Sequence, residues 1–222
     1  MFPLRDDRPT RSEPIVTILL IAACSAVFLH EILLDEFSRS YFIDKYAMVP
    51  AHLRLATLVT SQFVHAGWWH IIGNMIFLWA FGRSIEDALG HMNFLGFYIL
   101  CGIGAGLVHV AFNFYSRTPT VGASGAIAGI MGAYLLRFPR AHIRTLLFIV
   151  IFVTVVDIPA PFFVLYWFIT QVFNGYGSIA QTRVNEAGTA YFAHIGGFLT
   201  GMLLISTMGT RKRYLQVRED RW

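Results

Sequence analysis

Six apolar stretches, separated by shorter polar segments, limit how this chain can fold. In a lipid bilayer every backbone N–H and C=O needs a hydrogen-bond partner inside the protein, and a helix supplies these partners within one segment. Charged residues are 14 % of the chain, against about a quarter in a soluble domain. We therefore predict an all-α membrane protein whose six transmembrane helices form one bundle. The predicted spans cover residues 14–34, 68–82, 93–113, 122–138, 160–173 and 189–208.

Basic residues indicate which end of each span faces the cytoplasm, because Lys and Arg accumulate in cytoplasmic segments. Most of the 17 Lys and Arg residues fall before residue 14, between Arg137 and Arg144, and after residue 208. With six spans, these segments all lie on one side of the membrane. We therefore predict cytoplasmic tails at residues 1–13 and 209–222, a membrane domain at residues 14–208, and a long structured first outer loop. The net charge of +4 follows from this topology and is not a signal of nucleic-acid binding.

Two segments beside the spans are expected to leave the helical pattern. The polar residues from Arg83 to Gly90 are expected to form a turn that ends the second span. Residues 146–156 are apolar, but a helix of that length, at about 1.5 Å per residue, is too short for a hydrocarbon core of roughly 30 Å. Asp157 and Pro159 separate this segment from the fifth span. We expect it either to re-enter the bilayer or to lie along its interface.

The segment from Val121 to Gly132 places one hydroxyl group, that of Ser124, among small residues. Its glycines recur three or four residues apart, at Gly122, Gly125, Gly129 and Gly132. Such a strip lets a second helix approach at backbone distance, and helix packing alone would explain it. In the sixth span, Gly197 and Gly201 follow His194 in a similar way. Contact between the two strips would bring His194 to Ser124, so helix packing and catalysis predict the same geometry.

Three of the predicted spans begin on the outer side and carry polar residues in their first turns. These residues are His70 and Asn74, Ser124, and His194. Polar side chains are costly in lipid, so they either hold helices together or serve a function. A serine can cleave an amide when a base takes its proton and donors stabilise the oxyanion. His194 is the candidate base. His70 and Asn74 share a helix face and are candidate oxyanion donors, together with the backbone N–H of Ser124.

Two other kinds of site fit the sequence less well. A zinc-protease helix would carry a glutamate where Ile71 stands, and His65 and His70, five residues apart, do not share a helix face. A transporter would need acids within the spans, but Glu31 and Asp157 lie at span ends. The same lack of acids limits the catalytic group to a Ser–His dyad. We expect neither a metal nor a cofactor.

Four motifs stand in order along the chain: His65-Ala-Gly-Trp-Trp-His70-Ile-Ile-Gly-Asn74, Glu86-Asp87 with Gly90, Gly122-Ala-Ser124-Gly125, and Ala193-His194-Ile-Gly-Gly197. Together they resemble the rhomboid family of intramembrane serine proteases, of the bacterial six-span type, over about residues 14–208. The resemblance implies a nucleophile at Ser124 and a general base at His194. It implies oxyanion donors at His70, at Asn74 and at the backbone N–H of Ser124. It also implies a structural role for six further motif residues: His65, Glu86, Gly122, Gly125, Gly197 and Gly201.

The resemblance also implies what such a protein acts on. Rhomboid proteases cut transmembrane segments of membrane-protein substrates near the outer face, without a metal or cofactor. The expected partners are therefore these substrates and the lipid bilayer, with no nucleic acid, and the expected location is the bacterial inner membrane. The family's fifth span is the proposed substrate gate, which here contains Phe163, Trp167 and Phe168.

Two positions depart from the family pattern. Many members carry a Trp-Arg pair in the first loop, where this chain has Ala56-Thr57. Many members also place an aromatic ring one turn after the serine, stacked on the histidine, where this chain has Ala128. These departures leave open a rhomboid-like protein that binds transmembrane clients without cleaving them. The presence of both Ser124 and His194 favours the protease.

Overall fold

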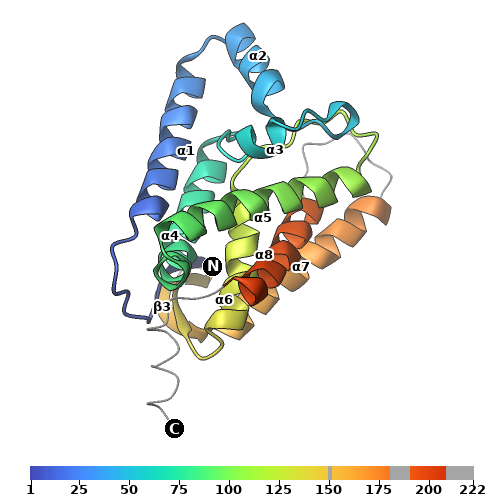
Figure 1. Ribbon diagram of the computed structural model, residues 1–222. Coiled ribbons are helices and arrows are strands. Elements are labelled where there is room, and N and C mark those ends of the chain that lie inside the picture. Colours follow the sequence, from blue (N-terminus) through green and yellow to red (C-terminus); the bar gives the residue numbers. More distant parts are fainter. Residues whose placement is uncertain (150–151, 181–190, 209–222) are drawn as a thin grey trace.

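The computed structural model describes residues 1–149, 152–180 and 191–208, which form a bundle of helices with a small sheet (Figure 1). The helices are α1 (Ile15–Leu33), α2 (Glu36–Tyr46), α3 (Thr57–Thr60), α4 (Trp68–Leu89), α5 (His91–Phe112), α6 (Ser124–Arg137), α7 (Ala160–Ala180) and α8 (Tyr191–Thr207), with a short 3-10 helix at Pro50–His52. The strands are β1 (Phe2–Asp6), β2 (His142–Ile149) and β3 (Phe152–Pro159). By length and composition, α1 and α5 could cross a membrane, and α7 and α8 provide shorter apolar helices. Each predicted span overlaps one of these helices, and the described ends of the spans differ from the helix ends by one or two residues where a span extends past its helix.

Helix α4 contains the polar segment that we expected to form a turn. It continues to Leu89, and Gly90, whose φ is 85°, joins it directly to α5. The expectation was wrong because the carboxylates in this segment are buried and hydrogen-bonded. Glu86 accepts hydrogen bonds from the backbone N–H groups of Val16 and Thr17, each at 2.8 Å, and so caps the start of α1.

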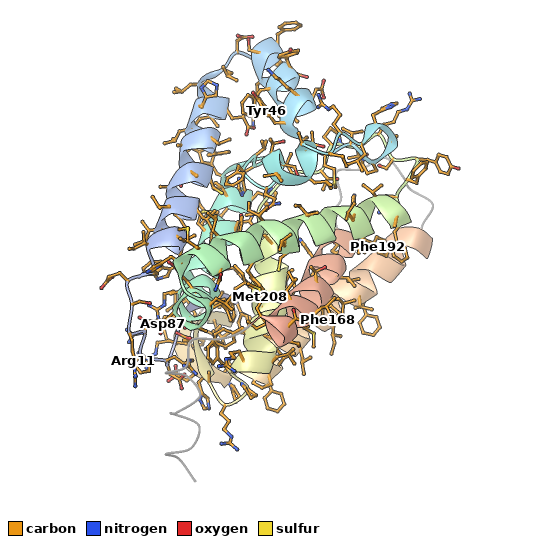
Figure 2. All side chains as sticks on the ribbon, in the orientation of Figure 1. Arg11, Tyr46, Asp87, Phe168, Phe192 and Met208 are labelled. Atoms are coloured by element: carbon orange, nitrogen blue, oxygen red, sulfur yellow. The ribbon has the colours of Figure 1, made fainter. Side chains whose placement is uncertain are left out.

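Asp87 holds the stretch of chain that leads into α1. Its carboxylate accepts hydrogen bonds from the backbone N–H groups of Arg11, at 3.2 Å, and Ser12, at 3.0 Å. Figure 2 shows Arg11 beside Asp87 at this end of the bundle. A buried carboxylate needs several donors to offset its lost hydration. The charged residues near the end of α4 therefore fix the N-terminal segment to the bundle.

A three-stranded antiparallel sheet corrects the prediction that the protein is all-α. β1 pairs with β2, with Asp6 opposite Ile143, and β2 pairs with β3. Residues 2–6 were expected in a tail, and they form β1. Residues 146–156 were expected to be re-entrant or interfacial, and the described part of this segment belongs to β2 and β3. Figure 1 shows the sheet and α2 at opposite ends of the bundle.

The alternation of buried and exposed residues in β2, and the residue types in β3, explain why these segments form strands. In β2, Ile143 and Thr145 are buried, whereas Arg144 between them is exposed. β3 is rich in β-branched residues, which favour strands. At the end of β1, the buried carboxylate of Asp6 accepts a hydrogen bond from the hydroxyl of Tyr134 on α6, at 2.8 Å. The sheet is therefore anchored to the helices through β1.

Helix α6 lies inside the bundle and packs against α4, α5, α7 and α8 (Figure 1). Its glycines meet the backbone of α8. A Cβ atom built on Gly201 would overlap the carbonyl oxygen of Gly129, and one built on Gly197 would overlap that of Gly125. No side chain larger than hydrogen fits at these two positions of α8. The close approach of the two glycine strips, predicted from the sequence, is present.

Replacing Gly201 by Ala should lower the melting temperature by several degrees. The added methyl group must push α8 away from Gly129, and overpacking of this kind costs about 1–3 kcal/mol, with 1 kcal/mol worth roughly 2–4 °C in a chain of this size. Gly96→Ala is the matched control, because nothing lies within 4 Å of a Cβ atom there. Unfolding in detergent can be followed with a thiol-reactive dye, since Cys24 and Cys101 are buried and free. Equal melting temperatures for the two variants would contradict the packing argument.

Candidate active site

Ser124 is the first residue of α6 and faces His194 of α8. The serine Oγ lies 2.8 Å from Nε2 of the histidine. His194 is 6 % exposed, while Ser124 is half-buried, so the hydroxyl can be reached but the base is shielded. The backbone contact between Gly125 and Gly197 holds these ends of the two helices together. The structure therefore brings together the two residues that the sequence named as nucleophile and base.

The second ring nitrogen of His194 has a partner that the sequence analysis missed. Nδ1 lies 2.7 Å from Oε1 of Gln171 on α7. An amide oxygen can only accept a hydrogen bond, so Nδ1 carries the hydrogen and Nε2 presents its lone pair to the Ser124 hydroxyl. The signal in the sequence was an amide side chain inside an apolar stretch, where a polar group needs a partner.

His70 and Asn74, on α4, lie beside Gly122. A Cβ atom built on Gly122 would be 2.7 Å from Nε2 of His70 and 3.5 Å from Nδ2 of Asn74. The φ of Gly122 is 119°, a conformation that favours glycine. Among the described residues, Nδ2 of Asn74 is buried without a hydrogen-bond partner. A buried donor without a partner can donate a hydrogen bond to the oxygen of an incoming group, which fits an oxyanion site next to Ser124.

His65, which precedes α4, and His70, in the first turn of α4, lie side by side with ring centroids 5.3 Å apart. Nδ1 of His70 accepts a hydrogen bond from the backbone N–H of Ala66, at 3.4 Å, so Nε2 carries the hydrogen and is a donor. Nδ1 of His65 donates to the carbonyl oxygen of Phe63, at 3.2 Å. Burial, and secondarily His70, lowers the pKa of His65 to about 4. His65 is therefore a neutral, buried neighbour of the proposed oxyanion donor.

The three aromatic residues predicted for the substrate gate all pack against the bundle. Phe163 is 2 % exposed. The ring of Trp167 lies 5.6 Å from that of His194, centroid to centroid. Phe168 stacks on Phe198 of α8, with centroids 4.3 Å apart, and Figure 2 shows it on α7. Trp167 and Phe168 lie in the contact between α7 and α8, whereas Phe163 packs against Phe77 and Phe81 of α4.

The first loop, which lacks the Trp-Arg pair, is held by a different arginine. The guanidinium of Arg54 donates to the carbonyl oxygens of Asp44 and Lys45, each at 2.6 Å, at the end of α2. The hydroxyl of Thr57 in turn donates to the carbonyl oxygen of Arg54, at 2.7 Å. These bonds join α2 to α3 at the place where Ala56-Thr57 replaces the family's pair.

The remaining motif residues lie outside the site. Glu86 is near the end of α4, whereas His70 is near its start, and Glu86 contacts the start of α1. Gly125, Gly197 and Gly201 belong to the contact between α6 and α8. In the part of the chain that the structure describes, no three His, Cys, Asp or Glu side chains lie together as metal ligands would.

Comparison with known proteins agrees with the motifs. The family model described as the Rhomboid domain matches residues 52–211, so the chain belongs to the rhomboid family. It is 30 % identical over 175 residues to Rhomboid protein 1, mitochondrial, of Saccharomyces cerevisiae, covering 73 % of this chain and 45 % of that protein. It is 28 % identical over 158 residues to Rhomboid protease GluP of Bacillus subtilis, covering 70 % and 26 %. It is 29 % identical over 164 residues to Rhomboid protease AarA of Providencia stuartii, covering 65 % and 52 %. The chain thus spans about half the length of these relatives, or less.

Replacing His65 by Gln should reduce the amount by which the melting temperature falls when the pH is lowered from 7 to 4. The pKa of His65 is about 4 in the folded protein, below the ordinary value of 6.5, so the unfolded chain binds the proton more tightly. The neutral imidazole then stabilises the fold above pH 6.5, and this contribution, roughly 3 kcal/mol, is lost as the pH falls toward 4. Melting temperatures measured in detergent between pH 4 and 7 test this, with His52→Gln, at an exposed position, as the control. The same slope in wild type and His65→Gln would overturn the prediction.

Proposed function

We propose that this rhomboid family member is an intramembrane serine endopeptidase that cleaves transmembrane segments of membrane-protein substrates near the outer face. The observation that carries the proposal is the 2.8 Å distance between Ser124 Oγ and His194 Nε2. The unpaired amide of Asn74, beside Gly122, supports it. Two of the relatives are named as rhomboid proteases, whereas others carry only a rhomboid-like name.

In the proposed mechanism, Oγ of Ser124 attacks the carbonyl carbon of the scissile peptide bond while Nε2 of His194 takes the hydroxyl proton. The oxyanion that forms accepts hydrogen bonds from Nε2 of His70, Nδ2 of Asn74 and the backbone N–H of Ser124. The intermediate collapses, the C–N bond breaks, and the imidazolium gives its proton to the leaving amine. A water molecule, deprotonated by the same imidazole, then hydrolyses the acyl-enzyme ester. No metal or cofactor takes part in these steps.

The proposed topology has six transmembrane helices, α1 and α4 to α8, with both chain ends in the cytoplasm. The membrane domain covers residues 14–208, between tails at residues 1–13 and 209–222. The pairing of β1 with β2 supports this topology, because it joins two segments that charge assigns to the same side. The starts of α4, α6 and α8, which carry the site, then lie at the outer face, and substrates enter past α7. The location proposed with this topology is the inner membrane of a bacterium.

Replacing Ser124 or His194 by Ala should abolish cleavage of a fluorogenic transmembrane peptide, because one change removes the nucleophile and the other removes the base. Both variants should also lose labelling by a fluorophosphonate probe. His70→Ala and Asn74→Ala should each lower kcat by about 10²- to 10³-fold, the usual cost of one oxyanion donor. Rates can be measured with purified protein in liposomes.

Asn93→Ala, which removes an exposed amide at the start of α5, is the control and should cleave at the wild-type rate. Equal and mild losses in all four site variants would refute the assigned roles. A wild-type protein that melts normally but neither labels nor cleaves would favour the alternative of a client-binding protein. In that case Ala56, Thr57 and Ala128 are the first positions to change.

A further inference from the structure

Gln171 meets the side of the base that faces away from Ser124. Its side chain is 8 % exposed, and its Oε1 lies 2.7 Å from Nδ1 of His194. The amide nitrogen of Gln171 donates to the hydroxyl of Thr170, at 3.2 Å, and to the carbonyl oxygen of Trp167, at 3.3 Å. These two bonds fix the amide with its oxygen toward the imidazole. The interaction therefore selects the tautomer in which Nε2 is free to take a proton.

The ring of Trp167, one helical turn before Gln171, lies against the same imidazole. The two ring centroids are 5.6 Å apart and the planes are inclined by 40°. Ala128 is fully buried in α6 and offers no ring at the position where many family members stack one on the histidine. Among the described residues, Gln171 and Trp167 thus orient His194 from outside α6 and α8, and both belong to α7.

Among the residues that the structure describes, no acidic side chain takes the place of Gln171 beside the base. Within these same ranges, the titratable side chains that act on His194 electrostatically are His70 on α4 and His109 on α5, and neither carries a negative charge. In a soluble Ser–His–Asp triad, the acid holds the imidazole in the required tautomer, and its loss leaves the wrong tautomer. A neutral amide oxygen can hold the tautomer in the same way, although it stabilises the imidazolium less.

We infer that α7 positions the catalytic base, with Gln171 holding the Nδ1–H tautomer of His194 and Trp167 limiting the rotation of its ring. Gln171 is a positioning residue beside the Ser124–His194 dyad expected from the sequence. The inference rests on the proposed protease function. Both restraints come from α7, so a displacement of α7 from α8 would withdraw them together. The geometry of the base is therefore linked to the position of α7.

The test compares the steady-state kinetics and pH–rate profiles of Gln171→Leu and Gln171→Glu in liposomes, with the same fluorogenic transmembrane peptide. Gln171→Leu removes the acceptor, so kcat should fall roughly tenfold to hundredfold while KM changes less than about twofold. Gln171→Glu keeps the acceptor and adds a negative charge, so it should retain most of kcat. Its acidic limb should move to higher pH by about one unit or more, because the carboxylate favours the protonated imidazole, which cannot act as a base. Tyr166→Leu, on the exposed face of α7, should match wild type in both measurements.

Each outcome separates this inference from the proposed function. Cleavage by wild type but not by Ser124→Ala, together with an unchanged kcat in Gln171→Leu, overturns the positioning role and leaves the protease function intact. Should Gln171→Leu fail to fold, the pH–rate profile of Gln171→Glu decides, and an unshifted acidic limb overturns the inference. If wild type cleaves no faster than Ser124→Ala, the proposed function itself fails.

Discussion

The contact between the backbones of α6 and α8 is the constraint on which the site depends. In lipid, apolar burial does little to draw helices together, so association relies on close van der Waals packing and hydrogen bonds. Gly125 and Gly197 are in backbone contact, and this contact provides that packing and also fixes the register of the two helices. Ser124 directly precedes Gly125, and His194 lies one turn before Gly197. With this register set, the hydroxyl and the imidazole meet at hydrogen-bond distance. The geometry of the site is therefore a consequence of helix packing.

A cluster of buried carboxylates organises the opposite end of the bundle. Glu86 caps α1, and Asp6 connects β1 to α6 through Tyr134. Asp6 is also paired with Arg83 of α4, at 3.1 Å. Carboxylates are strongly penalised away from water unless several donors surround them, so these bonds specify one arrangement of α1, α4 and β1. Because α4 carries His70 and Asn74 at its other end, the same cluster fixes the helix that presents the proposed oxyanion donors.

The helices and the proximity of Ser124 and His194 could be predicted from the sequence, because apolar stretches and glycine spacing are local patterns. In lipid, the need to satisfy every backbone hydrogen bond within the protein leaves few alternatives to a helix for such stretches. The prediction failed where distant residues decide. Glu86 was predicted to be part of a turn, because its charge becomes acceptable within a helix end through partners on α1 and α5: the N–H groups of Val16 and Thr17, the Thr17 hydroxyl and the His91 ring. Residues 146–156 were compared with the bilayer thickness as if they formed a helix, whereas the described part pairs with itself as the β2–β3 hairpin, and β2 is joined by β1 from the other end of the chain. Gln171 was missed because its role depends on which neighbour α7 meets, and composition does not reveal that.

The choice of an amide as partner for the base follows from the environment of α7. An aspartate at this buried position of a membrane-embedded helix would carry a charge away from water, and this charge would be costly whenever the base is neutral. Gln171 avoids that cost in the resting state and still orients the imidazole. In the proposed reaction, the imidazolium is then stabilised less than in a triad with an acid. The ring of Trp167 offsets part of this deficit by restricting the motion of the base on a second side. A site in lipid can thus exchange charge stabilisation of the base for neutral positioning from a neighbouring helix, which makes the packing of α7 against α8 part of the proposed catalytic geometry.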